Sequence, residues 1–200
     1  MRLVLISDTH DQRLSDIPIG DVLIHCGDAF CGDDMASLRS DLAWIGALPH
    51  RWKLFVRGNH DLCLDWALRA HPPMVEKLLG AAGITLLRDS DVEIEGVKFH
   101  GIDWQSRVAI PRGVDVIISH EPCYGILDAG LGSPALGRVV LSARPRLFIS
   151  GHVHGARGHV VRDGIHFYNA TLESANAGAA VAASSHTVTL PTVSPWVVDL

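Results

Sequence analysis

The stretch Leu3–His10, LVLISDTH, is an apolar run that ends in an aspartate and a histidine. Four consecutive apolar residues bounded by polar ones are typical of a short strand buried on both faces. Asp8 and His10 follow this run with one residue between them, and alternate residues of an extended segment point the same way. Both side chains can therefore reach one metal ion. Alone, this spacing is weak evidence, because Asp8 could equally be a turn cap.

Four further polar blocks follow apolar runs in the same manner. The apolar runs are residues 22–25, 54–56, 114–119 and 147–150, and the blocks are Gly27-Asp28, Gly58-Asn59-His60-Asp61, Ser119-His120 and Gly151-His152-Val153-His154. With the first block they supply two carboxylates, one amide and four imidazoles. The candidate ligands are Asp8, His10, Asp28, Asn59, His120, His152 and His154. This set is large enough to hold two divalent ions, and Asp28, with two carboxylate oxygens, is the natural candidate to bridge them.

Each block also has a simpler interpretation. Asp28 could be a turn residue, Asn59 a left-handed residue and His120 a core histidine with satisfied hydrogen bonds. The ordered combination favours a metal site, because five of the twelve histidines fall inside the blocks. Six of the other seven histidines are assigned from their surroundings: His25 and His100 are predicted in the core, and His50, His71, His159 and His186, which lack ligand spacing, on the surface.

Oxygen and nitrogen ligands without thiolate favour manganese, iron, zinc, nickel or cobalt over calcium or magnesium. Two such ions about 3.5–4 Å apart can activate a water between them and stabilise both the attacking and the departing oxygen at phosphorus. Cleavage of a phosphate ester then needs no protein nucleophile. His60, oriented by Asp61, could act as the general acid that protonates the leaving oxygen. Arg57 could contact phosphate, although a surface ion pair is an equal alternative.

Length and composition indicate an ordinary globular protein. The chain has 200 residues, of which 48% are hydrophobic and 20% charged, and we expect one domain spanning residues 1–200. The formal net charge is −5. Because nucleic-acid binding normally depends on clustered lysine and arginine, long nucleic acids are disfavoured as partners and a small substrate is expected.

The spacing of the cysteines and the length of the first apolar run indicate the cellular compartment. The four cysteines form no C-x-x-C pair, which is typical of reduced thiols in a cytoplasmic protein. The first apolar run is too short for a signal peptide or a membrane span. We therefore expect a cytoplasmic protein without a membrane partner.

Helical spacing and turn residues complete the expected fold. We predict helices from Asp33 or Asp34 to about Leu48, from Pro72 to Leu79, and from Pro134 to about Ser142. Glu95-Gly96 and Asp163-Gly164 predict two hairpins, and residues 187–190 and 196–198 are predicted as final strands. Residues 175–185 are predicted as a surface loop or a short helix. The mixture predicts an α/β sandwich of two sheets with helices outside.

The motifs D-x-H, G-D, G-N-H-D, H and G-H-x-H, in this order, resemble the calcineurin-like metallophosphoesterase superfamily. Other segments are similar to one branch of it, the metallophosphoesterase-domain-containing proteins of animal brain and their bacterial relatives. These segments are residues 17–28, Arg144-Pro145-Arg146-Leu147, Tyr168-Asn169-Ala170 and Val197-Val198-Asp199-Leu200. The resemblance spans nearly the whole chain.

This resemblance implies a four-layer α/β/β/α sandwich of two mixed β-sheets flanked by helices. It assigns Asp8, His10 and His154 to the first metal, Asp28 to a bridge, and Asn59, His120 and His152 to the second metal, with His60 as the acid. It also implies phosphodiesterase activity, often on cyclic nucleotides and usually with manganese, and a homodimer. Some animal members carry glycine where His152 stands, so His152 favours a competent enzyme. Cys31 and the length of residues 175–185 depart from the family pattern.

The leading hypothesis is a dinuclear metal-dependent phosphodiesterase that acts on small phosphodiesters. A phosphomonoesterase or a nuclease on the same metal core is the alternative within enzymes. Outside enzymes, one alternative is a binding scaffold, as in the retromer subunit with this fold, which has lost metal ligands. The last alternative is that the metals only stabilise the fold. The complete ligand set disfavours both of these.

Overall fold

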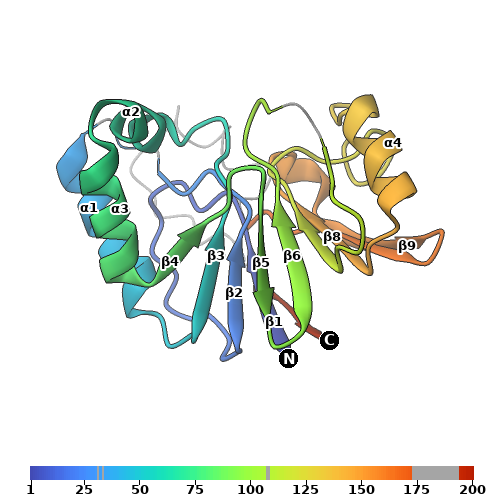
Figure 1. Ribbon diagram of the computed structural model, residues 1–200, viewed down its shortest axis with the longest axis horizontal. Helices are drawn as coiled ribbons and strands as arrows, with labels where there is room; N and C mark the ends of the chain where they lie inside the picture. Colours follow the sequence, from blue (N-terminus) through green and yellow to red (C-terminus); the bar gives the residue numbers. More distant parts are fainter. Residues whose placement is uncertain (31, 33, 107–108, 173–193) are drawn as a thin grey trace, which may run out of the picture.

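The computed structural model describes residues 1–30, 32, 34–106, 109–172 and 194–200. Within them the chain forms two β-sheets (Figure 1). The first sheet contains β1 (Arg2–Ile6), β2 (Val22–His25), β3 (Trp52–Phe55), β4 (Ile84–Leu86) and β11 (Trp196–Asp199), in the order β11-β1-β2-β3-β4. The second contains β5 (Ser90–Ile94), β6 (Val97–Gly101), β7 (Val116–Ile118), β8 (Leu147–Ser150), β9 (Gly158–Arg162) and β10 (Ile165–Asn169), in the order β5-β6-β7-β8-β10-β9.

Both sheets are mixed. Strands β1, β2, β3 and β4 run parallel, and β11 adds antiparallel to β1. In the second sheet β6, β7, β8 and β10 run parallel, whereas β5 and β9 are antiparallel edge strands. Parallel neighbours place their carboxyl ends at one edge of the sheet. This edge is uppermost in Figure 1.

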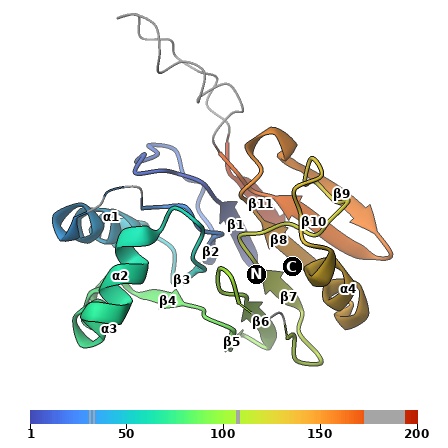
Figure 2. The ribbon, with the colours of Figure 1, turned by 90° about the horizontal axis from the view of Figure 1, so that it is seen from above.

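Helices cover the outer faces of the two sheets. Three of them, α1 (Met35–Ala47), α2 (Leu62–Ala70) and α3 (Pro72–Ala82), lie beside the first sheet, and α4 (Pro134–Ala143) lies beside the second (Figures 1 and 2). A short 3-10 helix, η1 (His154–Ala156), follows β8. The predicted α/β/β/α arrangement of two mixed sheets is therefore confirmed.

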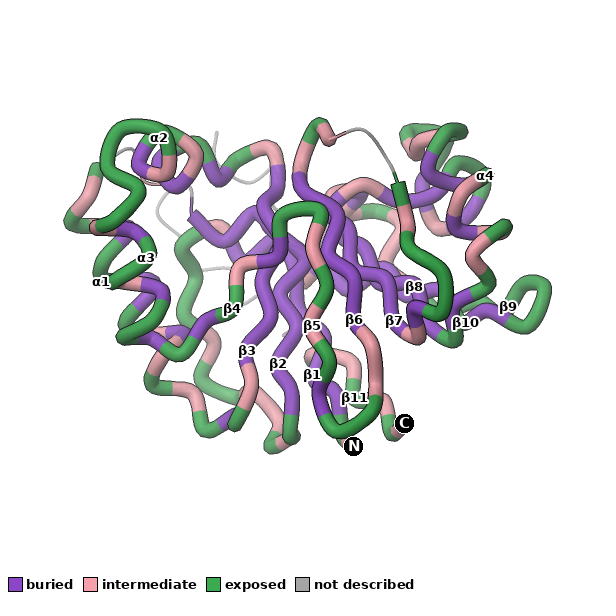
Figure 3. The backbone as a smooth tube through the Cα atoms, in the orientation of Figure 1, coloured by how far each residue is buried: buried purple, intermediate pink, exposed green. Residues whose placement is uncertain are grey.

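The central strands are buried on both faces (Figure 3). Each contributes side chains to the cluster between the sheets and to a second cluster under the helices. In β1, Leu3 and Leu5 pack between the two sheets, and the intervening Val4 and Ile6 pack against the helices over the first sheet. Alternate residues of a strand point to opposite faces, so a strand covered on both sides must be apolar throughout. This explains why the sequence shows continuous apolar runs instead of alternation.

The helix ends follow the predicted capping residues. Asp34 caps α1 by accepting hydrogen bonds from the backbone N–H groups of Ala36 (2.7 Å) and Ser37 (2.8 Å). Pro72 begins α3, and Ser133 accepts from the Leu136 N–H (3.3 Å) at the start of α4. Both predicted hairpins are present as β5–β6 and β9–β10.

The structure also differs from the sequence-based expectations. Helix α2 and strand β4 had not been predicted, and α3 extends to Ala82. The prediction that His50 lies on the surface is wrong: the residue is 3% exposed, and its Nε2 lies 3.0 Å from the Pro18 carbonyl oxygen. Several predictions lie outside the described residues; they concern Cys31, Asp33, His186 and the segments 175–185 and 187–190.

None of the helices in the described part of the chain has the length and apolar character needed to cross a membrane.

The packing between the sheets generates a stability prediction. Ile118 of β7 is fully buried in the inter-sheet cluster. Ile118→Ala is expected to lower the free energy of unfolding by about 2–5 kcal/mol, because it removes apolar contact and leaves a cavity. Urea unfolding measures this. Val161→Ala on β9, where the side chain is 52% exposed, is the matched control and should change stability by less than about 0.5 kcal/mol. Equal effects of the two substitutions would contradict this account of the core.

Candidate metal centre

Two groups of ligand side chains meet at the edge formed by the carboxyl ends of the strands. One group contains Asp8, His10 and His154, and the other contains Asp28, His120 and His152. Within each group the candidate ligand atoms lie within 4.8 Å of one another. The residues come from the segments that follow β1, β2, β7 and β8, so residues far apart in the sequence converge in space.

The first group has both oxygen and nitrogen ligands. His154 Nε2 lies 3.3 Å from Asp8 Oδ1 and 3.5 Å from His10 Nε2. Burial alone would raise the pKa of Asp8, but hydrogen bonding to His154 and the charge of His120 hold it far below its ordinary value. Asp8 therefore carries its negative charge at neutral pH, as a metal ligand requires.

The second group is arranged around His120. Its Nε2 lies 3.2 Å from Asp28 Oδ2 and 3.0 Å from Asn59 Oδ1. Its Nδ1 lies 2.7 Å from the Cys26 carbonyl oxygen, which can only accept a hydrogen bond, so Nδ1 carries a proton and Nε2 is the ring nitrogen directed at the site. His152 joins this group, with its ring centroid 5.0 Å from that of His120.

The two groups have the composition of a site for two divalent ions. Carboxylate, amide and imidazole donors converge in each, and the described donors include no thiolate. The structure divides the ligands between the two groups as the resemblance implied, and Asn59 lies with the second. Asp28 groups with His120 and His152, while its bridging role stays a prediction. The residues therefore fit a pair of metal ions.

His60 lies at the exposed side of this centre. Its backbone N–H donates to Asp28 Oδ1 (2.7 Å), and its ring centroid is 5.3 Å from that of His10. An exposed imidazole beside the ligands can exchange a proton with a bound substrate and with solvent. The position is consistent with the role of general acid that was predicted for His60.

The predicted role of Asp61 requires a correction. Its carboxylate is buried and does not act by orienting the His60 side chain. Instead it accepts four backbone hydrogen bonds: Oδ2 from Asp28 (2.9 Å) and Gly58 (2.7 Å), and Oδ1 from Ala29 and Phe30 (2.9 Å each). Burial raises the pKa of Asp61 to about 6, against the effect of these donors. Asp61 is therefore a positioning residue that joins two ligand-bearing loops.

Arg57 forms ion pairs, as one of the two sequence-based interpretations held, but below the surface, and the contact with phosphate stays a prediction. It is buried and not on the surface, with 8% of the residue exposed. Its Nε and Nη2 bind the two oxygens of Asp103 at 2.8 and 2.6 Å, and its Nη1 pairs with Asp65. The guanidinium is thus already engaged by two carboxylates, which a contact with phosphate would have to replace. Arg57 joins β3, α2 and the segment after β6.

Several ligands have an unusual backbone conformation. Asp8, His10, Asp28 and His152 have φ values of 56°, 45°, 55° and 67°, in the left-handed region. For residues other than glycine this conformation costs free energy and is concentrated at functional sites. The turns aim the side chains at the centre instead of letting the chain continue as strands, and no motif in the sequence signals them.

Glycines allow the loops to approach one another closely. A Cβ added to Gly58 would collide with the Asp28 carboxylate, and one added to Gly151 would collide with Ser7 and Asp8. Gly27 has φ of +96°, and a Cβ there would meet the backbone of Arg57 and Gly58. Close contact therefore requires glycine at all three positions, and at Gly27 the backbone conformation requires it as well.

His25 and Trp104 contribute to the centre although sequence reasoning had not placed either there. His25 is buried as predicted, but its ring also joins two ligand turns, with Nε2 3.0 Å from Thr9 Oγ1 and Nδ1 accepting from the Gly27 N–H at 3.2 Å. Burial lowers the pKa of His25 to about 3, so the ring is neutral. Trp104 lies with its ring centroid 5.4 Å from those of both His120 and His152. Only its aromatic character in a loop could have suggested it.

Comparison with known proteins identifies the family. The profile of the calcineurin-like phosphoesterase family matches residues 1–156. The chain is 30% identical over 219 residues to metallophosphoesterase domain-containing protein 1 of Homo sapiens, covering 88% of this chain and 67% of that protein. It is 31% identical to a UPF0046 protein of Caenorhabditis elegans, covering 85% of this chain and 69% of that protein.

Solved structures show the same fold. A phosphopantetheinyl hydrolase from Mycobacterium tuberculosis superposes with a TM-score of 0.60 at 14% identity, covering 86% of this chain and 89% of that chain. The chain belongs to the calcineurin-like phosphoesterase family, in the branch that the sequence motifs indicated. Family membership and the two ligand groups together support metal-dependent hydrolysis of phosphate esters.

The close approach at Gly58 generates a prediction about metal binding. Gly58→Ala is expected to displace the Asp28 carboxylate and to lower both metal content and activity, the latter by roughly 100-fold, because small displacements of reacting groups are costly. Elemental analysis and a phosphodiester assay measure the two effects.

Gly80→Ala is the matched control, since a Cβ at that helical glycine meets nothing within 4 Å. It should retain full metal content and activity. Full metal content in Gly58→Ala would show that the space beside Asp28 is not limiting.

Proposed function

We propose that the protein is a metal-dependent phosphodiesterase that hydrolyses small phosphodiesters, with cyclic nucleotides among the candidate substrates. The observation that carries this proposal is the convergence of two complete oxygen and nitrogen ligand groups beside an exposed histidine. Manganese is the metal we propose for the site, as the resemblance to the family implies. Iron, zinc, nickel or cobalt are the alternatives, because mixed oxygen and nitrogen donors without thiolate suit all five metals.

The side chains of the centre would have three roles: holding the metal ions, donating a proton and positioning the ligand turns. When bound, two divalent ions activate water and stabilise the negative charge that develops on the phosphate oxygens. Asp8, His10 and His154 would hold one ion, Asn59, His120 and His152 would hold the other, and Asp28 would contribute to both. His60 would donate its proton to the oxygen of the departing alcohol, which would otherwise leave as an unstable alkoxide. Asp61 and His25 would keep the ligand turns in place.

The net charge favours a small substrate. The formal charge of −5 offers no general attraction to a long nucleic-acid backbone, since that attraction depends on lysine and arginine contacts with many phosphates. A small diester needs only the local positive charge of the metal pair. We therefore propose a small phosphodiester and not a nucleic-acid polymer.

An activity screen with measured metal content tests the function. The purified chain is stripped with a chelator, reloaded separately with each candidate metal, and assayed on bis(4-nitrophenyl) phosphate, 4-nitrophenyl phosphate and cyclic nucleotides. We expect turnover only with metal, highest with manganese, and faster on diesters than on the monoester. A metal-loaded protein that hydrolyses only the monoester would identify a phosphomonoesterase. A melting shift without turnover on any ester would reject the enzyme hypothesis.

The role of His60 predicts a dependence on the leaving group. His60→Ala should lower kcat by roughly 100-fold or more for an alkyl leaving group, which needs a proton. The loss should be much smaller for 4-nitrophenolate, which leaves without one. Steady-state assays of a matched pair of methyl and 4-nitrophenyl diesters measure this.

His159→Ala, which changes another exposed histidine on β9, is the control and should leave both rates unchanged. Metal content should be the same in all three proteins. Equal losses on the two substrates would mean that His60 is not the proton donor.

A further inference from the structure

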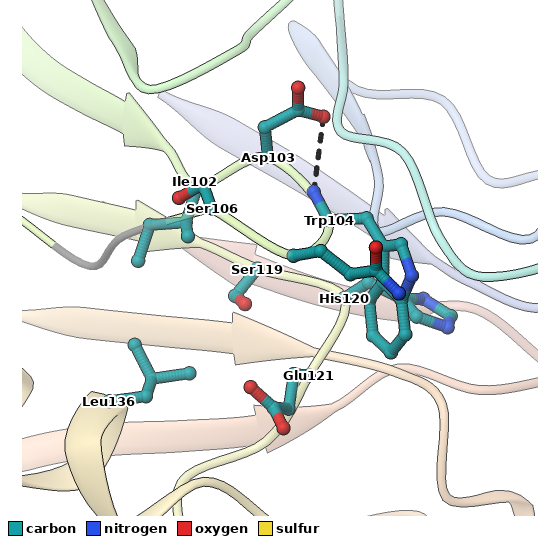
Figure 4. Close-up of a pocket in the computed structure, with 9 residues that line it drawn as sticks. Ile102, Asp103, Trp104, Ser106, Ser119, His120, Glu121 and Leu136 are labelled. Carbon is teal, nitrogen blue, oxygen red and sulfur yellow. Dashed lines mark hydrogen bonds between the residues drawn. The ribbon is translucent and has the colours of Figure 1, made fainter. Parts of the chain in front are cut away.

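A small cavity lies directly beside the metal centre and is not formed by the ligand groups, apart from His120. Its volume is about 40 Å³. It is lined by residues 102–106 after β6, by residues 119–121 after β7 and by the first turn of α4 (Figure 4). Its lining includes Trp104, Gln105, Ser119, His120, Glu121 and Leu136.

The lining of this cavity combines hydrogen-bonding groups with apolar walls. Glu121 presents a carboxylate and Ser119 a hydroxyl, while Leu136 and Trp104 provide apolar surface. Gln105 adds an amide to the lining. Glu121 receives a hydrogen bond from Ser133, but a carboxylate can accept about four, so acceptor capacity is left for a ligand. A group that both donates hydrogen bonds and has a carbon framework fits this environment.

The volume restricts what can enter. A cavity must offer about 10–15 Å³ to hold one water-sized group, so this one admits only about three such groups. An aromatic base or a second phosphate is too large. Two neighbouring hydroxyl groups on a small alcohol are of the right size and would each donate to an acceptor in the lining.

Position connects the cavity to the reaction. His120 lines the cavity and also lies in the second ligand group, with its Nε2 3.2 Å from Asp28. Trp104 lines the cavity and contacts the rings of both His120 and His152. An ester whose phosphate is held by the second group could therefore extend its alcohol along Trp104 into the cavity.

We propose that this cavity receives the hydroxyl groups of the alcohol portion of the phosphodiester, and that it selects esters of hydroxyl-bearing alcohols such as ribose. Glu121 accepts from a substrate hydroxyl, and Trp104 packs against the carbon framework of the alcohol. Both are specificity-determining residues and neither takes part in bond cleavage. The inference rests on the proposed phosphodiesterase function.

A matched pair of substrates tests the inference. Uridine 5′-(4-nitrophenyl phosphate) and its 2′,3′-dideoxy analogue share the phosphate, the base and the leaving group and differ only in the two ribose hydroxyls. The manganese-loaded protein is expected to prefer the hydroxylated ester by roughly tenfold in kcat/KM, because an unmade hydrogen bond leaves a polar group unsatisfied. In Glu121→Gln the preference should fall to less than about threefold, because the charged acceptor is lost.

Controls keep the outcomes distinct. Glu76→Gln makes the same chemical change on an exposed residue of α3 and should keep the wild-type preference. Metal content and melting temperature verify that the variants are folded, and Ser119→Ala replaces Glu121→Gln if the latter does not fold. Equal rates on the two esters, or a preference that survives the cavity variants, would overturn the subsite. Failure to hydrolyse these esters and bis(4-nitrophenyl) phosphate with both metals bound would instead overturn the proposed function.

Discussion

The buried carboxylate of Asp61 is the contact on which the arrangement of the metal centre depends. Its four backbone hydrogen bonds join the turn after β2, which carries Asp28, to the turn after β3, which carries Asn59 and His60. A charged group without partners would be costly in this position, and four N–H donors offset that cost. The same donors would otherwise be unsatisfied in the interior. One side chain thus accepts hydrogen bonds from the backbone N–H groups of two loops. It thereby fixes the distance between the ligands Asp28 and Asn59, which are 31 residues apart in sequence.

Much of the fold could be predicted because its signals are local. The runs that form β1, β2 and β8 are apolar except for one terminal residue each, as is typical of strands covered on both faces. Asp34 and Ser133 mark helix starts by their capping chemistry. The ligand positions followed from the same reasoning, because parallel strands bring their carboxyl ends to one edge. Helix α2 had no such signal: Asp61 stands at its start but directs its carboxylate to the loops and not to the helix N–H groups.

The roles of individual site residues could not be predicted where they depend on distant partners. Arg57 forms ion pairs with Asp103 and Asp65. These partners are adjacent only in the folded chain, where the end of β3, α2 and the segment after β6 meet. His25 has the sequence environment of a core residue, and only the folded turns show that its ring joins Thr9 to Gly27. Asp8 and Asp28 have left-handed backbones in turns that contact other segments, since the Asp8 N–H donates to the Gly27 carbonyl (3.0 Å) and the Asp28 N–H to the Asp61 carboxylate (2.9 Å).

The first and last residues of the described chain lie side by side. Met1 and Leu200 exchange hydrogen bonds of 3.2 and 2.9 Å between their backbones, at the edge of the sheets opposite the metal centre (Figure 1). A short linker could therefore join them, and new ends could be opened at the exposed Asp163-Gly164 turn without crossing either sheet. Such a circular permutant would keep every ligand turn in place. The chemistry therefore requires that the ligand turns meet in space, whatever their order along the chain.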